Sequence, residues 1–126
     1  MKSYKELALY DMKSAEASYE YELWNKVGRE SQQICEKYLK QYLQENHLLT
    51  EELERSHNLK KLLRIIQDYD KDIYRQVSII TGYYYETNYP GENYIELDKE
   101  MADEAMEIAK SLIRYIDCLE TDTEKN

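Results

Sequence analysis

Apolar residues recur at intervals of three and four along nearly the whole chain, and little in the sequence interrupts them. The first such segment, residues 4–20, places Ala8, Met12, Ala15 and Tyr19 on one helical face. Only 3 Gly and 1 Pro occur among the 126 residues, so few positions favour a tight turn or a break. The sequence therefore predicts amphipathic helices joined by short connections.

The same spacing predicts four further helices, each with one apolar face. Residues 46–52 are expected to form a linker, and 87–97, which hold the densest cluster of helix breakers, the main loop. The second helix is expected over about 24–45 and the fourth over about 72–85. The third is expected to begin after an N-cap at Ser56, and the last after an N-cap at Asp98. The inward residues are expected to include Leu59, Leu62, Leu63, Ile66 and Tyr69 in the third helix and Ala102, Ala105, Ile108, Ala109, Leu112 and Ile116 in the last.

Five amphipathic helices with short loops can bury their apolar stripes only by packing against one another. The fold class predicted is therefore all-α, an up-and-down bundle of about five helices. A chain of this length suffices for one domain with its own core. We expect the bundle over residues 1–119 and a solvated tail over 120–126.

The net charge of −9 is spread unevenly. Residues 86–126 hold 12 acids and 4 bases, a net of −8, whereas residues 1–85 hold 14 acids and 13 bases, a net of −1. Within the first part, the ten residues from Arg55 to Arg64 contain four bases, one His and no acid. This window is the one part of the sequence that favours contact with an anion.

The sequence gives little support for several other classes of protein. No stretch reaches the about 18 apolar residues of a membrane span, and the first residues do not form the apolar core of a signal peptide, so a soluble, cytoplasmic protein is expected. Cys35 and Cys118 fall in predicted helices without metal-ligand spacing and are expected as buried free thiols. The acids at 68, 70 and 72 resemble the start of a calcium loop, but Ile73 and Ile79 occupy the positions of its Gly and Glu. Neither a metal nor a cofactor is predicted.

Three short polar clusters stand out from the helical sequence, each in or beside a different predicted helix. They are Gln33, Glu36, Lys37 and Lys40 in the second helix, Arg55, Ser56, His57, Asn58 and Leu59 at the start of the third, and Tyr84, Tyr85, Glu86, Thr87, Asn88, Tyr89 and Pro90 at the end of the fourth.

Together these clusters resemble the motifs of the HEPN family of small helical-bundle proteins, over roughly residues 4–118. The similarity is strongest to the branch found beside minimal nucleotidyltransferases. In the third cluster Asn88 stands where that family usually has arginine. The resemblance implies a helical bundle that dimerises and pairs with a nucleotidyltransferase in a toxin–antitoxin or stress-related system. The chain's 14 Tyr and no Phe fit either a partly hydrated interface or a core whose rims touch water.

RNA-cleaving HEPN proteins carry an arginine and, after four to six intervening residues, a histidine. Here Arg55 lies two residues before His57 and Arg29 eighteen before His47, so that pattern is absent. We therefore predict a non-catalytic or weakly catalytic interaction module. Two alternatives stay open: a metal-independent endoribonuclease that uses His57, and a nucleotide-binding accessory subunit.

His57 is the candidate catalytic residue, as a base beside a phosphate-clamping arginine. Its structural alternative is that the ring fixes the loop between the second and third helices. His57, Lys61 and Arg64 are expected on one face of the third helix, as a basic ridge. The predicted binding residues are Lys37, Lys40, Arg55, His57, Lys61 and Arg64. The family-motif residues are Gln33, Glu36, Lys37, Asn88, Tyr89 and Pro90, of which the first three are also typical of an ion-paired surface between helices.

Overall fold

The computed structural model describes residues 2–88, 91 and 94–125, and within these ranges the chain contains helices and no strand. This confirms the predicted all-α bundle. None of the helices described is both long enough and apolar enough to span a membrane. The helices are α1 (Tyr4–Glu20), α2 (Trp24–Glu45), α3 (Glu51–Arg55), α4 (Leu59–Leu63), α5 (Lys71–Asn88) and α6 (Lys99–Lys125).

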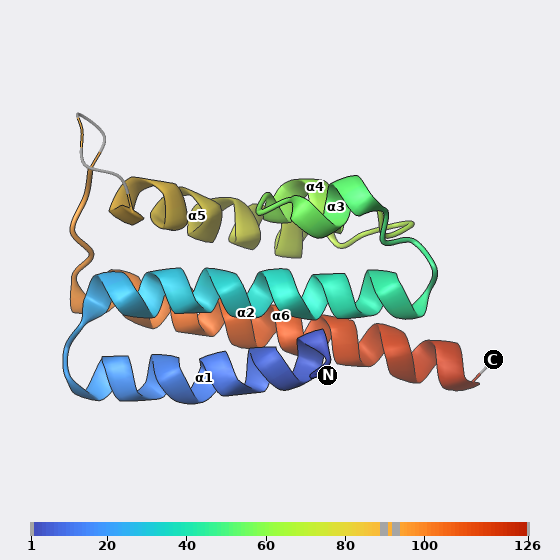
Figure 1. Ribbon diagram of the computed structural model, residues 1–126, viewed down its shortest axis with the longest axis horizontal. Coiled ribbons are helices and arrows are strands. Elements are labelled where there is room, and N and C mark those ends of the chain that lie inside the picture. Colours follow the sequence, from blue (N-terminus) through green and yellow to red (C-terminus); the bar gives the residue numbers. More distant parts are fainter. Residues whose placement is uncertain (1, 89–90, 92–93, 126) are drawn as a thin grey trace.

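The four long helices form an up-and-down bundle around α2 (Figure 1). Helices α1 and α5 run in one direction and α2 and α6 in the other. The central helix α2 contacts α1, α6, α5 and α4, and the short helices α3 and α4 lie at one end of α5. Because α2 touches every other long helix, polar residues in its middle must find partners inside the protein.

Local signals account for the bounds of α1 and α2, which are those predicted. The Ser3 hydroxyl accepts a hydrogen bond from the Glu6 backbone N–H, and the Glu6 side chain bonds back to the Ser3 backbone in a capping box. Both helices end without glycine: Glu22 and His47 take the left-handed conformation, at φ 59° and 60°. In each case the next N–H bonds five residues back, from Leu23 to Ser18 O and from Leu48 to Leu43 O.

The predicted third helix is wrong in its extent. A short helix, α3, begins at Glu51 inside the predicted linker, and the chain then re-enters a helix only at Leu59. Ser56 is not the N-cap of α4, because the Asn58 side chain accepts the hydrogen bond from the Lys61 N–H. Helix α4 ends at Leu63, so that Tyr69, which is partly buried, lies beyond the helix.

The caps of the last two helices are aspartates. The Asp70 carboxylate accepts from the N–H groups of Asp72 and Ile73 at 2.8 and 3.0 Å, where α5 begins. Helix α5 reaches Asn88, three residues beyond its expected end. Asp98 caps α6 as predicted, accepting from the Met101 N–H at 2.8 Å. Helix α6 continues through Lys125, into the segment expected to be a tail.

The core lies between α1, α2, α4, α5 and α6, and the predicted inward residues are confirmed except Tyr69, which is only partly buried. Leu59, Leu62, Leu63 and Ile66 are buried, as are all six predicted positions of α6. Gly28 has a packing role in α2: a Cβ atom there would lie 2.4 Å from the Leu97 side chain. The segment before α6 thus packs closely against the central helix, and an alanine at position 28 would require the Leu97 side chain to shift.

The two cysteines differ in their surroundings. Cys35 is buried in the core, as predicted, but Cys118 is exposed, so the prediction of two buried thiols is wrong for the second. The position of Cys118 follows from α6, whose buried face is carried by neighbours such as Leu112 and Ile116. Burial raises the pKa of the Cys35 thiol, which keeps it in the unreactive protonated form.

A thiol reagent should therefore distinguish the two cysteines. We expect one thiol per chain to react with a disulfide reagent in the folded protein and two in guanidinium chloride, because Cys35 becomes accessible only on unfolding. Cys118→Ser should abolish the native reaction and leave one thiol in denaturant. Two fast-reacting thiols in the folded wild type would contradict the placement of Cys35.

Candidate functional site

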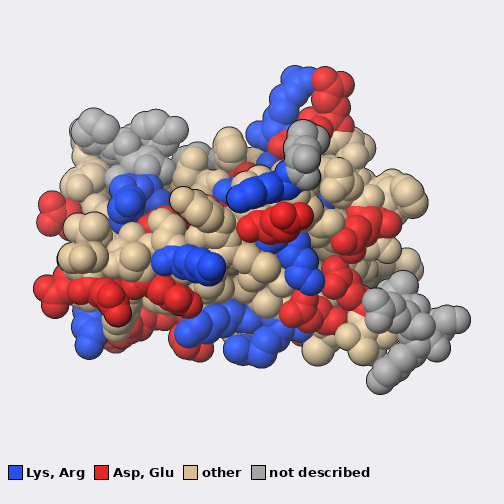
Figure 2. Space-filling model, turned by 60° about the horizontal axis from the view of Figure 1, so that its bottom comes forward, with Lys and Arg blue, Asp and Glu red and all other residues tan. Residues whose placement is uncertain are grey.

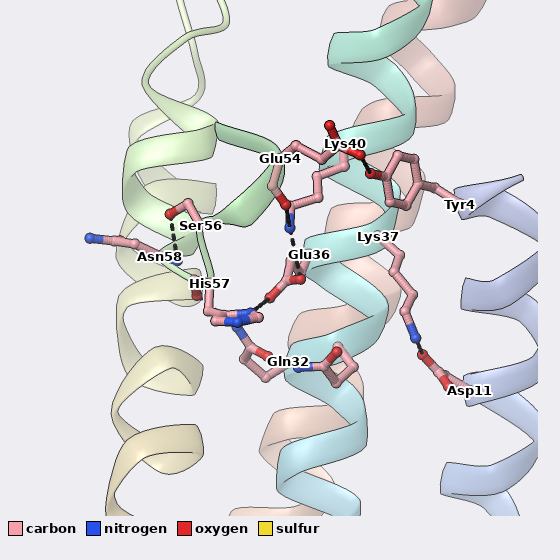
Figure 3. A network of polar contacts seen from close by, with 11 residues as sticks. Tyr4, Asp11, Gln32, Glu36, Lys37, Lys40, Glu54, Ser56, His57 and Asn58 are labelled. Carbon is pink, nitrogen blue, oxygen red and sulfur yellow. Dashed lines mark hydrogen bonds and ion pairs between the residues drawn. The ribbon is translucent and has the colours of Figure 1, made fainter. Parts of the chain in front are cut away.

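The first two polar clusters meet between the middle of α2 and the connection from α3 to α4 (Figure 3). The carboxylate of Glu36 lies at the centre, and its side chain is only 7% exposed. One oxygen contacts the His57 Nδ1 at 2.9 Å, and the other accepts a hydrogen bond from the Lys40 Nζ at 3.0 Å. Glu36 thus joins a half-exposed imidazole to a buried ammonium group.

Lys40 is buried too, with a side chain that is 4% exposed. Besides Glu36, its ammonium group donates to the backbone carbonyl of Glu54 at 2.6 Å. That carbonyl belongs to the last turn of α3, where a cation is favourable because the carbonyls lack helical partners. Lys40 therefore fixes the end of α3 against α2.

Side-chain hydrogen bonds fix the backbone around His57. The Ser56 hydroxyl accepts from the Asn58 N–H at 3.1 Å, and Asn58 in turn caps α4. From α2, the buried Gln32 amide donates to the His57 carbonyl at 2.9 Å, while Gln33 donates to the Gln32 side chain. The connection is bound to α2 through both the backbone and the ring of His57.

The start of the third cluster reaches the same place. The Tyr84 ring of α5 stacks beside the His57 ring, with centroids 6.1 Å apart and planes at 30°. The side chain of Asn88, and Tyr89 and Pro90, lie outside the described part of the structure. Contacts from α2, the α3–α4 connection and α5 thus converge on His57, whose side chain is still 53% exposed.

The Glu36–His57 contact has a chemical consequence. When Glu36 is ionised it only accepts hydrogen bonds, so Nδ1 must donate, and in the neutral ring Nε2 then carries the lone pair. A carboxylate that orients an imidazole in this way is one component of a general-base site. Cleavage of a phosphodiester also needs a cation to stabilise the charge that develops on phosphate.

The predicted cations are mostly engaged by acids of the same chain. Lys37 pairs with Asp11 of α1, Arg55 with the neighbouring Glu51, and Lys61 with Glu52. The Lys61 hydrogen bond holds the pKa of the Glu52 carboxyl below its ordinary value.

The expected basic ridge is not formed on one helix. His57 precedes the N-cap Asn58 and so lies outside α4. Arg64 is the C-cap at the other end, and its guanidinium lies 5.9 Å from the centroid of the Tyr74 ring. Lys61 alone of the three lies within α4, because the helix is shorter than the pattern predicted.

Three participants were not predicted from the sequence: Gln32, the Glu54 carbonyl and Tyr4. Gln32 lies four residues before Glu36 and eight before Lys40, on the same face of α2, and this spacing could have identified it in place of its neighbour Gln33. The Glu54 carbonyl has no sequence signal, since every residue has a backbone carbonyl. The Tyr4 hydroxyl donates to the Glu54 side chain at 3.3 Å, and burial and then Glu54 raise the pKa of Tyr4.

The site offers no set of metal ligands. Among the described residues, no group of three or more His, Cys, Asp and Glu side chains could hold a metal ion. The polar groups that converge here bind one another.

This chain is similar to a known domain family and to solved structures. The chain matches the HEPN domain over residues 1–119. Among curated proteins no significant match is found. Of solved structures, ST0689, described as an archaeal HEPN homologue, is 21% identical with a TM-score of 0.76, covering 94% of this chain and 98% of that one. TT1696 from Thermus thermophilus is 19% identical with a TM-score of 0.77, covering 90% and 93%. Identities this low support the fold alone, but the match over residues 1–119 is to the family itself, and this chain belongs to the HEPN domain family.

Proposed function

We propose that this HEPN protein is a non-catalytic or weakly catalytic interaction module that works as a homodimer with a nucleotidyltransferase partner, in a toxin–antitoxin or stress-related pair. The observation that supports this proposal most is that the motif side chains bind one another and the backbone of α3. Glu36 is buried and binds both Lys40 and His57, and Lys40 also binds the Glu54 carbonyl, so that these motif side chains hold α3 and the α3–α4 connection on α2.

The distribution of charge favours a protein partner over a polyanion. Three of the predicted phosphate-binding cations are paired with Asp11, Glu51 and Glu52. Figure 2 shows acidic and basic side chains interspersed on the face that it presents, without a continuous basic field. Residues 86–126 add a net charge of −8, which repels RNA.

The nature of the partner rests on the motifs that resemble the nucleotidyltransferase-associated branch. We expect a short nucleotidyltransferase reading frame beside the one for this chain, and co-elution of the two proteins in one size-exclusion peak after co-expression. Separate elution of the two folded proteins at micromolar concentrations would count against the pairing. Sedimentation of this chain alone as a species of about 15 kDa, its own mass of 15.2 kDa, would count against the homodimer.

A second candidate, a metal-independent endoribonuclease, is favoured by the hydrogen bond between Glu36 and His57 Nδ1. We nevertheless expect no RNA cleavage that depends on His57, because loss of a clamping cation costs roughly 100-fold in rate even where a base remains. The measurement is incubation of structured and single-stranded RNA at low salt, with EDTA, with wild type and His57→Ala.

A matched control uses the second histidine. His47 lies at the left-handed C-terminus of α2, a conformation that asparagine tolerates, so His47→Asn removes an imidazole without breaking the helix end. Cleavage that disappears in His57→Ala, persists in His47→Asn and accompanies unchanged helicity would replace the first proposal with the nuclease.

A further inference from the structure

A hollow of about 330 Å³ lies between α1 and α6. The residues that line it are Glu16 and Tyr19 of α1 and Asp103, Met106, Glu107 and Lys110 of α6. Tyr19 and Met106 are half-buried, and the four charged residues around them are exposed. This volume is at the lower end of the range for ligand sites, so the hollow suits the end of one long side chain better than a cofactor.

The hollow is open because the two helices both pack on α2 more than on each other. Of the described helices, α2 alone packs closely against α1, whereas α6 packs against both α2 and α5. Helices α1 and α6 run in opposite directions (Figure 1). At one end of the pair, hydrogen bonding to Asp103 raises the pKa of the Tyr19 hydroxyl, and at the other end Lys5 lies near Glu120. The two helices thus form antiparallel walls on either side of the hollow.

Apolar side chains continue from the hollow along both walls. On α1 the row is Leu9, Met12, Glu16 and Tyr19, spaced three, four and three apart, and on α6 Ile113 follows Met106 by seven residues. Met12 and Ile113 are only partly buried against the core, and Leu9 is 51% exposed. We call these residues and the hollow the α1–α6 groove. A straight apolar groove between two helices is the shape that receives a third amphipathic helix, and methionine adapts to such a partner.

The rim of the hollow carries three acids and one base. Within the described part of the chain, no lysine or arginine forms an ion pair with Glu16 or Asp103. The Lys110 Nζ lies 3.8 Å from Glu107, and both of these side chains are largely exposed, at 46% and 67%. Acidic side chains gather at the lower left of Figure 2, the end of the bundle at which α1 ends and α6 begins. The rim is therefore complementary to a cation, and neither RNA nor a second copy of the acidic α6 matches it.

We propose that a basic amphipathic helix of a partner protein binds in the α1–α6 groove. Its apolar residues, spaced three and four apart, lie on Leu9, Met12 and Ile113, and one arginine or lysine enters the hollow. The aliphatic stem of that residue packs on Met106 beside the Tyr19 ring, and its charge reaches the acids of the rim. The inference rests on the proposed interaction module and assigns to it a surface and the chemistry of a partner.

Titration with a model peptide tests this proposal. The probe has about 18 residues, with leucines spaced three and four apart, arginine and lysine at the other positions, and neither Trp nor Tyr. Trp24 is the one Trp of the chain, and its ring centroid lies 5.2 Å from that of Tyr19, so its fluorescence reports on the hollow. Calorimetry gives the dissociation constant and the stoichiometry.

We expect one peptide per chain, bound in the micromolar range at about 0.1 M salt, where screening still allows contacts between near charges. A peptide with glutamate in place of its arginines and lysines should bind at least about tenfold more weakly. A peptide of the original composition with its leucines spread around the helix should be weakened as much, because it has no apolar face.

Charge-neutral variants locate the site. Glu16→Gln/Glu107→Gln should raise the dissociation constant of the peptide about tenfold. Glu51→Gln/Glu52→Gln is the matched control, because it removes the same charge from two acids of α3 that are 80% and 77% exposed. Helix α3 lies toward the opposite end of the bundle from the hollow (Figure 1), so this control should stay within about twofold of wild type.

A second pair of variants tests the apolar wall. Leu9→Gln should weaken the peptide severalfold, because it removes apolar surface that the partner covers. Leu7→Gln changes a leucine on another side of the same helix, 37% exposed, and should leave the dissociation constant unchanged. Both variants should keep the helicity of wild type.

The remaining outcomes each decide against the proposal. No binding of the peptide, or binding that neither Glu16→Gln/Glu107→Gln nor Leu9→Gln weakens, would overturn the α1–α6 groove. Spermine that binds as tightly as the peptide and competes with it would reassign the hollow to a free polyamine. Peptide binding that dissociates a wild-type dimer would assign the groove to a second copy of the chain. Because the titration uses neither the nucleotidyltransferase nor RNA, its failure is distinct from a failure of the proposed function, which co-elution and the cleavage assay decide.

Discussion

Replacing Lys40 with methionine should lower the free energy of unfolding by about 3–5 kcal/mol, measured by guanidinium chloride denaturation. Methionine keeps most of the apolar stem, so that the main loss is the ammonium group. Glu36 would then be a buried carboxylate without its cation, and the Glu54 carbonyl would lose its donor. An unpaired buried charge is among the costliest defects that one substitution can introduce.

Lys37→Met is the matched control, since Lys37 is in the same helix and also pairs with a carboxylate. Its side chain and that of Asp11 are each about one-fifth exposed, at 22% and 20%, so water can solvate the carboxylate left behind. We expect a loss below about 1 kcal/mol. Equal losses for the two variants would mean that Lys40 is not buried in an ion pair.

A double-mutant cycle with Glu36→Gln should show strong coupling. Each single variant leaves one partner buried and uncompensated, whereas the double variant leaves none, so its cost should be clearly less than the sum of the two. Additive costs would indicate that Glu36 and Lys40 are stabilised by separate partners.

The bounds of α1 and α2 could be read from the sequence because their determinants are local. Apolar spacing defines the buried face, and for α1 the capping box at Ser3 sets the first turn. The bounds of the helices between α2 and α5 could not be read from the sequence, because contacts with α2 interrupt these helices. Lys40 binds a carbonyl of α3 and Gln32 binds the carbonyl of His57, and neither partner has a sequence signature.

The contacts within the site could not be predicted from the sequence for the same reason. Glu36 and His57 were identified from the motifs, but their contact was not, since it joins residues 21 apart across two elements. Lys40 was predicted to bind a ligand, which requires an exposed side chain, and lysine is usually exposed. In the structure it follows the buried Leu39 and Glu36 on the inner side of α2, where its charge is satisfied within the protein.

Leu63→Ala should cost about 2–5 kcal/mol, measured in the same way. Leu63 is fully buried in α4, which packs between α2 and α5, so alanine leaves a cavity that neighbouring helices cannot fill without moving. Lys61→Ala, two residues earlier, is expected to cost less than about 0.5 kcal/mol, because its pair with Glu52 is exposed. Similar losses of unfolding free energy for the two variants would mean that the apolar stripe of α4 has been assigned to the wrong face of the helix.

Since α4 follows directly after His57 and Asn58, Leu63→Ala should also loosen the site. Hydrogen exchange at the Lys61 N–H, which Asn58 caps, should accelerate more in Leu63→Ala than in Lys61→Ala.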